Sequence, residues 1–219
     1  RAITLKARSP GFADGTAPFT TTDNDVGTLS LDIPAVVTEG DGVLYQSVSI
    51  TPAPSYDVTV TLSTSDTTEL SVPPTVTVLA GEGFAYIPGY VVDDTQQDGA
   101  QDVTLTARVP TWANATATTS VRDNELHHFA LSNVTSPQQA GVPISLTASA
   151  RSVDDVIISN FFGSVTFTAA GASGPLALTP YFGFFNAGVF SGLFTANTAD
   201  TQVVISMDDS QGHVAQTAP

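Results

Sequence analysis

A segment of the chain recurs at an offset of 100 residues, and this repeat constrains the fold more than any other feature of the sequence. Residues 3–25 (ITLKARSPGFADGTAPFTTTDND) align without a gap to residues 103–125 (VTLTARVPTWANATATTSVRDNE). Phe12 aligns with Trp112, and both copies end in a polar Asp-Asn segment. So many matches in one ungapped register indicate a shared structural unit.

The repeated unit has the pattern of a β-hairpin. In VTLTARV apolar and polar residues alternate, PTWAN supplies the turn, and ATATTSV returns. One copy closes a domain near residue 125, and the other closes a preceding domain near residue 25. We therefore predict three parts. They are residues 1–25 as the C-terminal hairpin of a preceding repeat, residues 26–125 as a complete domain, and residues 126–219 as a second domain whose last strand is cut short at Pro219.

Residues 26–125 alternate apolar and polar side chains in short segments, separated by turns that contain Gly or Pro. The strands are predicted at residues 28–33, 35–38, 44–51, 57–64, 75–79, 84–92, 102–109 and 115–122. No apolar stripe of helical spacing extends beyond about two turns. The chain is therefore predicted to be all-β, with two tandem antiparallel β-sandwiches of the immunoglobulin-like kind.

The charge of the chain limits its partners. Its 219 residues include 21 Asp and Glu against 6 Lys and Arg, which gives a formal net charge of -15. Such a surface repels nucleic acid and anionic membranes and attracts divalent cations. The chain has no cysteine, which excludes disulfides and thiol chemistry, and no run of 18 apolar residues that could insert into a membrane. Because it opens on Arg1 in the middle of a predicted strand, we expect it to be part of a longer secreted chain.

Several motifs occur in an order that resembles the Calx-β family, which is found in sodium-calcium exchangers, integrin β4 and bacterial surface proteins. They are VVTEGDG, VTVTLSTSD, TVTVLAGEGFAYIPGYVVDD, QDVTLTA and VRDNE, which lie in residues 27–125 and recur in part in residues 1–25. From Leu126 the chain instead resembles a bacterial immunoglobulin-like or filamin-type repeat, through QQAGVP, FFGSVTFTAAG and a late DDSQG turn. The resemblance implies a bacterial protein that is secreted or held at the cell surface.

In the domain formed by residues 26–125, the acidic side chains gather at the predicted turns and at the C-terminal end, residues 123–125. Strands of a sandwich alternate in direction, so several of these turns can fall at one end, where their carboxylates could supply the six to eight oxygen ligands that calcium takes. The alternative is ordinary solvated turns, because Asp and Asn side chains bond to nearby backbone N–H groups. The residues concerned are Glu39, Asp66, Asp93, Asp94, Asp98, Asp123 and Glu125.

The resemblance implies that calcium binds at the end of the sandwich next to the linker, with these seven residues as the metal ligands. By motif, Glu39 matches the acidic position of the E-G-D turn, and Asp93 and Asp94 match the family's paired aspartates. Asn124 interrupts the acidic triplet at the exit, which lowers the ligand charge. We therefore expect one weak calcium site.

These features predict a non-catalytic spacer or adhesive segment of a large repeat protein, stiffened by calcium at the domain junction and contacting neighbouring repeats of its own chain. An enzyme is not expected, since the sequence has no G-x-S-x-G, P-loop, G-x-G-x-x-G or H-E-x-x-H motif. Two alternatives stay open. The chain could be an accessory module that binds a glycan or a surface protein through aromatic residues of segment 181–194. It could also self-associate head to tail into a filament, with the strands of residues 1–25 completing a sheet in a neighbouring chain.

Overall fold

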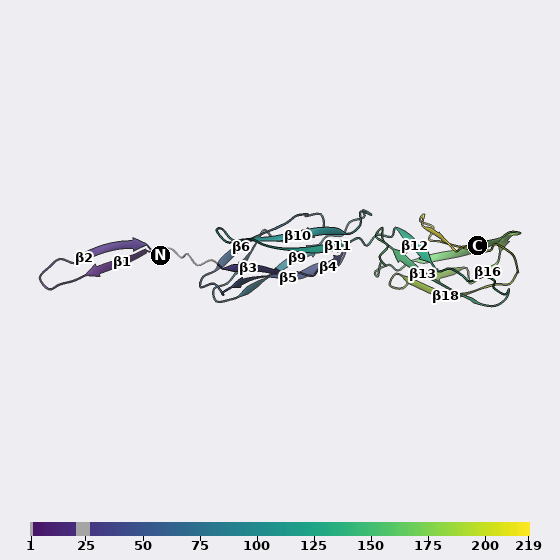
Figure 1. Cartoon of the computed structure of the whole chain (residues 1–219), viewed down its shortest axis with the longest axis horizontal. Helices are drawn as coiled ribbons and strands as arrows, with labels where there is room; N and C mark the ends of the chain where they lie inside the picture. The colour runs from purple at the N-terminus through teal and green to yellow at the C-terminus, as the bar shows by residue number, and fades with distance from the viewer. Residues whose placement is uncertain (1, 21–26) are drawn as a thin grey trace.

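The computed structural model describes residues 2–20 and 27–219, which form a hairpin followed by two β-sandwiches (Figure 1). Strands β1 (Ala2–Ala7) and β2 (Gly15–Thr20) pair antiparallel and make the hairpin. The predicted domain boundary at residue 25 and the Asp23-Asn24 pair lie outside the described residues. Within the described part of the chain, no helix has the length and apolar character needed to cross a bilayer.

The first sandwich follows from Gly27 and has two sheets, with strand orders β4-β11-β10-β6-β8 and β3-β5-β9-β7. Its strands are β3 (Thr28–Asp32), β4 (Val36–Thr38), β5 (Gly42–Thr51), β6 (Val58–Thr64), β7 (Leu70–Ser71), β8 (Thr75–Val78), β9 (Phe84–Val91), β10 (Gln101–Arg108) and β11 (Ala115–Arg122). Eight of them lie within two residues of the ranges predicted from the alternation, and β7 was not predicted.

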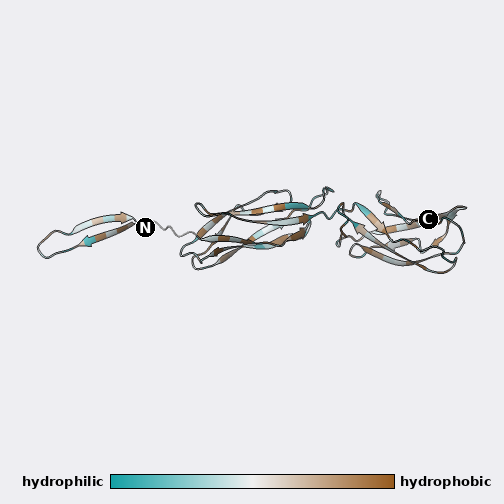
Figure 2. Ribbon diagram, viewed as in Figure 1, coloured by the Kyte–Doolittle hydropathy of each residue, from teal (hydrophilic) through white to brown (hydrophobic). Residues whose placement is uncertain are grey.

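Apolar and polar residues alternate along the strands of this sandwich (Figure 2), and burial follows the same alternation. In β6 the side chains of Val58, Val60 and Leu62 are buried, and the residues between them are exposed. The buried residues form two apolar clusters. The larger one includes Ile50, Val60 and Leu105, and the smaller one consists of Val37, Leu44, Leu70, Val91, Val103 and Val121. The smaller cluster lies where β4, β7, β9 and β11 meet.

One strand pair departs from the predicted antiparallel pattern. β4 pairs with β11 in the parallel direction, with Val36 opposite Ser120 and Thr38 opposite Arg122. Every other pair of strands in the described residues is antiparallel. The parallel pair makes the C-terminal ends of β4 and β11 lie side by side, and this decides where the turn that follows β4 is placed.

The second sandwich has sheets of order β12-β13-β18-β16 and β15-β14-β19-β20, with β17 also paired to β14. Its strands are β12 (His128–Leu131), β13 (Ile144–Arg151), β14 (Ser164–Gly171), β15 (Gly174–Leu176), β16 (Leu178–Thr179), β17 (Phe182–Phe184), β18 (Val189–Ala196), β19 (Val204–Asp208) and β20 (Val214–Gln216). Phe167, Phe190 and Phe194 pack against one another in its core. The all-β sandwich fold predicted from the sequence is therefore confirmed.

Candidate functional site

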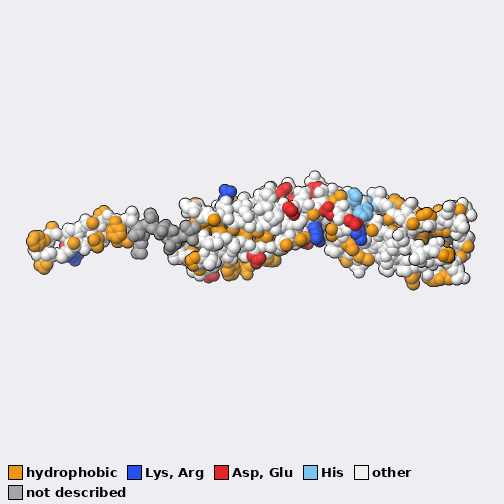
Figure 3. All heavy atoms as spheres, viewed as in Figure 1, with side chains coloured by type: hydrophobic (Ala, Val, Ile, Leu, Met, Phe, Trp, Pro, Cys, Tyr) orange, Lys and Arg blue, Asp and Glu red, His pale blue; other side chains and the backbone are white. Residues whose placement is uncertain are grey.

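Four chain segments converge at the end of the first sandwich that faces the second sandwich. The parallel β4–β11 pair brings Glu39 beside the exit of β11, and the Glu39 N–H donates to the Arg122 carbonyl at 2.9 Å. The antiparallel β7–β9 pair brings Glu69 beside the end of β9, and the Val92 N–H donates to the Glu69 carbonyl at 2.9 Å. In Figure 3 most of the Asp and Glu side chains visible on this face lie around the junction between the sandwiches, and a few lie along the lower edge of the first sandwich.

Carboxylates from three of these segments form one group. One oxygen from each of Glu39, Asp93 and Glu125 lies within 4.8 Å of the others. Glu39 is 3% exposed, Glu125 is half-buried and Asp93 is exposed, so the group extends from the surface into the protein, where it lies near Asp123, which is 4% exposed. We use the name acidic cluster for Glu39, Glu69, Asp93, Asp123 and Glu125.

Hydrogen bonds fix the exit segment against the other segments of the acidic cluster. The Asn124 amide donates to the Glu39 carbonyl at 2.7 Å and to the Asp93 carboxylate at 2.8 Å. Asp123 accepts from the Glu125 N–H at 2.8 Å and from the Gly99 N–H at 3.3 Å. Asn124, which interrupts the acidic triplet of the resembled family, therefore acts as an uncharged bridge between two carboxylate-bearing turns.

The surroundings of the acidic cluster disfavour ionisation. The smaller apolar cluster of the core lies next to these carboxylates in the chain. Its Leu70 directly follows Glu69, and its Val37 and Val121 lie two residues before Glu39 and Asp123. Burial, together with the charges of Glu125 and Glu69, raises the pKa of Glu39 to about 8. Burial and the neighbouring Asp123 raise the pKa of Glu125 to about 7. Burial likewise raises the pKa of Glu69.

Two buried carboxylate oxygens of the acidic cluster have no hydrogen-bond partner. They are Oε2 of Glu39 and Oε2 of Glu125. Among the ion pairs of the described residues, none joins the acidic cluster to a Lys, Arg or His side chain. A buried polar atom without a partner is costly, and a group of them that lacks a counter-charge is more so. The acidic cluster therefore has unmet capacity for a cation.

The geometry fits a calcium ion. Calcium–oxygen distances are about 2.3–2.6 Å, so two ligands on opposite sides of one ion lie about 4.8 Å apart. Oxygens of Glu39, Asp93 and Glu125 within 4.8 Å of one another can thus reach a common ion. The donor set consists of carboxylate oxygens, which suit a hard divalent cation.

The other predicted ligands lie around the acidic cluster, and two of them have carboxylates that accept local hydrogen bonds. Asp66 accepts from the N–H and the hydroxyl of Thr68, and these bonds lower its pKa. Asp94 accepts from the backbone and side chain of Gln96, which lowers its pKa. Asp98 is exposed, and its charge contributes to the raised pKa of Glu69. These three residues shape the electrostatic field, and the closely spaced group does not include them.

Glu69 belongs to the acidic cluster, and sequence reasoning missed it. Its side chain is 2% exposed. It directly precedes β7, which is only two residues long and therefore shows no alternation that could mark a strand. The signal available in the sequence was a second acidic residue three positions after Asp66, in the segment SDTTEL.

The acidic cluster is continuous with the contacts between the two sandwiches. The segment 92–100 holds Asp93 at its start, and at its end the Ala100 N–H donates to Asp154 of the second sandwich. The Gln97 side chain donates to the Leu126 carbonyl at 2.7 Å. Leu126 packs against the core of the second sandwich and directly follows Glu125. No linker residue therefore separates the acidic cluster from the second core.

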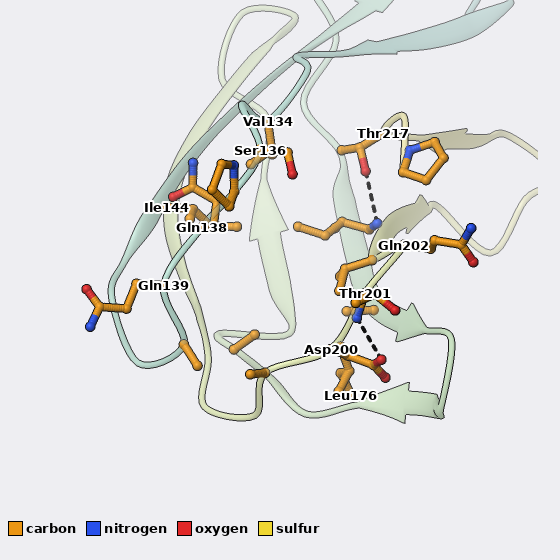
Figure 4. A pocket seen from close by; sticks show the side chains of 18 of the residues that line it. Val134, Ser136, Gln138, Gln139, Ile144, Leu176, Asp200, Thr201, Gln202 and Thr217 are labelled. Carbon is orange, nitrogen blue, oxygen red and sulfur yellow. Dashed lines mark hydrogen bonds between the residues drawn. The ribbon is translucent and has the colours of Figure 1, made fainter.

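A cavity of about 330 Å³ opens in the second sandwich between segments 134–144, 198–205 and 217–219 (Figure 4). Asp200 is the one carboxylate among its lining residues, which include no histidine. The N–H groups of Thr201 and Ser173 donate to Asp200 and lower its pKa, so this carboxylate is ionised and already engaged. The cavity has a mixed polar and apolar lining with a fixed negative charge at one edge.

The predicted aromatic segment divides between core and surface. Phe185, Phe190 and Phe194 are buried in the second core. Three other rings are exposed and meet edge to face, with centroids 5.4 and 5.7 Å apart. These exposed rings, which we call the Tyr181 cluster, are Tyr181, Phe182 and Phe184.

No protein-family model matches the chain, and no curated protein matches it in sequence. Among solved structures, calcium binding domain CBD12 of CALX1.1 aligns with a TM-score of 0.49 at 12% identity, over 83% of this chain and 80% of that chain. CBD12 from CALX1.2 aligns with a TM-score of 0.48 at 12% identity, over 81% and 79%. The S-layer protein rSbsC(31-844) aligns with a TM-score of 0.33 at 13% identity, over 99% and 27%. At these scores the similarity assigns no function to the chain, and the resemblance of residues 126–219 to immunoglobulin-like or filamin-type repeats stays a prediction.

Proposed function

We propose that this chain is a non-catalytic spacer or adhesive segment of a bacterial secreted or cell-surface protein, and that calcium bound by the acidic cluster stiffens its two-sandwich unit. The observation that carries the proposal is the pair of buried, unpartnered oxygens on Glu39 and Glu125, within a closely spaced carboxylate group. A divalent cation satisfies these oxygens and balances their charge in one step. The net charge of -15 favours the binding of cations.

The ligands would be supplied by the acidic cluster. Glu39, Asp93 and Glu125 would contact the ion directly, and Asp123 and Glu69 lie close enough to contribute charge. Because three elevated pKa values must be overcome when the carboxylates deprotonate, binding releases protons and strengthens with pH. The same energetic cost makes the site weaker than one built from carboxylates that are already ionised.

Stiffening follows from the position of the ligands. Glu125 lies in the exit segment directly before Leu126, and Asp93 begins the segment whose other end meets Asp154 of the second sandwich. An ion that ties Glu125 and Asp93 to the body of the first sandwich would restrict both connections to the second. Tandem domains held in this way act as a rod, since no slack separates them.

Calcium titration of the intact chain tests the proposal. We expect the unfolding midpoint of the first sandwich to rise with calcium and to return to its starting value in excess EDTA. The free energy of unfolding should increase by about 2.7 kcal/mol when calcium is 100-fold above Kd. Asp93→Asn and Glu125→Gln should each weaken this response. Glu82→Gln, which changes the same charge at an exposed turn outside the acidic cluster, is the matched control. Equal unfolding midpoints with calcium and with EDTA would refute calcium binding.

A second candidate function is ligand binding through the Tyr181 cluster. Tyr181 is 65% exposed and Phe184 is 68% exposed. Groups of exposed aromatic residues often mark binding sites, because aromatic faces bind sugar rings or partner side chains. A glycan array probed with the intact chain and with a Tyr181→Ser, Phe184→Ser variant separates this function from the first. Binding that the variant loses supports a ligand-binding module. Equal signals from the two proteins contradict it.

A further inference from the structure

The β1–β2 hairpin exposes an apolar face. Every residue of both strands is exposed. Leu5 is 64% exposed and Phe19 is 48% exposed, and Ile3 and Ala17 lie on the same face by alternation. A two-stranded hairpin in water is marginally stable by itself, so this face needs a covering surface.

The hairpin has an internal twin, β10–β11, in the identical register. Ile3 lies opposite Phe19 as Val103 lies opposite Thr119, and Leu5 lies opposite Ala17 as Leu105 lies opposite Ala117. In the twin, Val103, Leu105 and Thr119 are fully buried. The turn residues also correspond, because Phe12 is 79% exposed whereas its counterpart Trp112 packs against the core of the first sandwich.

The surroundings of the twin define what covers such a face. The edge of β10 pairs with β6, so that Leu105 lies opposite Thr64 and Ala107 opposite Leu62. The inner face of β10–β11 packs in a core with Ile50 and Ile87 of the facing sheet. Residues 27–100 supply all of these partners.

We propose that the β1–β2 face docks onto a sandwich body of the same kind as residues 27–100. This body and the hairpin belong to one polypeptide, in the same order as residues 27–100 and the β10–β11 hairpin. The body supplies an edge strand equivalent to β6 and an apolar sheet face that receives Ile3, Leu5, Ala17 and Phe19. The hairpin thereby closes a third sandwich, and its inner face is an interface that binds one specific partner.

Charge complementarity supports this partner. Residues 1–20 contain three Lys and Arg and one acidic residue, whereas residues 27–100 contain ten Asp and Glu and no Lys or Arg. A basic hairpin therefore matches an acidic body of this kind. Phe19 takes the place of the fully buried Thr119, so the natural body has more room opposite this position than residues 27–100 provide.

The test extends the full chain by a copy of residues 27–100 placed directly before Arg1, which recreates the spacing of the first sandwich. Chymotrypsin cleavage after Phe12, followed by mass spectrometry, reports whether the hairpin is covered. We expect cleavage at least about tenfold slower in the extended chain than in the unmodified one, because proteolysis follows the population of the open state. Phe19→Thr should increase this protection.

Two variants of the extended chain make the test specific. Leu5→Asp places a charge in the docking face and should restore the cleavage rate of the unmodified chain. Thr16→Asp places the same charge on the opposite face, where its twin Thr116 is exposed, and should leave the protection intact. Equal cleavage rates in the extended and unmodified chains, with and without Phe19→Thr, would overturn the proposal. So would protection of the unmodified chain that rises with protein concentration, since the occupant would then be a second copy.

Discussion

Replacement of Glu39 by glutamine should stabilise the protein when calcium is absent and destabilise it when calcium is present. In calcium-free protein, the folded state holds Glu39 in a buried site with a pKa of about 8, against 4.5 for an unperturbed glutamate. The unfolded chain ionises this group freely at pH 7, which favours unfolding. A glutamine side chain at this position would have nearly the same shape and would not ionise in either state. The variant is therefore expected to be more stable than the natural protein in EDTA.

The magnitude follows from the two pKa values. At pH 7 the folded protein keeps Glu39 mostly protonated, so the penalty is set by the 2.5 units between pH 7 and the unfolded pKa of 4.5 and is about 3.4 kcal/mol, at 1.36 kcal/mol for each pKa unit. Solvent screening at the end of the sandwich reduces this to roughly 1.5 kcal/mol. For a domain of this size that is a rise in Tm of about 6–12 °C. In calcium the natural protein gains about 2.7 kcal/mol at 100-fold excess over Kd, and the variant loses this gain.

Differential scanning calorimetry at pH 7, in EDTA and in calcium, measures the reversal. The first sandwich of the variant should melt higher than the natural protein in EDTA and lower in calcium. Glu82→Gln, with the same change in charge at an exposed turn, should melt like the natural protein in both buffers. A variant that melts lower than the natural protein in EDTA would show that Glu39 stabilises the calcium-free fold, and the reasoning from burial would be wrong.

Three further outcomes are expected. In EDTA, stability should decrease as pH rises, because groups whose pKa is raised on folding stabilise the protein at low pH. The decrease should occur between pH 4.5 and about 8 for Glu39 and between pH 4.5 and about 7 for Glu125. Urea unfolding midpoints in a pH series measure it. Asp154→Ala should change Tm little but widen the range of angles between the sandwiches, seen in residual dipolar couplings, because it removes the acceptor for the Ala100 N–H. Phe194→Ala should destabilise the second sandwich by about 3–5 kcal/mol and leave the calcium response unchanged, as calorimetry with and without calcium would show.

Much of the fold could be predicted because its signals are local. The alternation in Val58–Thr64 marks β6 without reference to any other strand. The repeat at an offset of 100 residues predicts that both hairpins share one form, and β1–β2 and β10–β11 do have the same register. The parallel β4–β11 pair was not predictable in this way, since three-residue β4 carries no sign of its distant partner.

The acidic cluster was predictable in part. The turn sequences marked Glu39, Asp93, Asp123 and Glu125 as candidate ligands, because acidic residues there lie outside the alternating strands. Burial was not predictable, since a TEGDG turn is ordinarily exposed whereas Glu39 is 3% exposed. The bridge made by Asn124 was likewise hidden, because both of its acceptors come from segments distant in sequence.

The sequence by itself determined that the chain forms β-sandwiches, that one hairpin occurs twice, and that acidic residues occupy the turns, because periodicity and turn chemistry act between near neighbours. Tertiary structure alone decided which carboxylates lose water and which share a site. Desolvation and charge repulsion depend on distances set by long-range pairing, such as that of β4 with β11. The contact of Asp154 with Ala100 was decided in the same way, by the packing of one sandwich against the next.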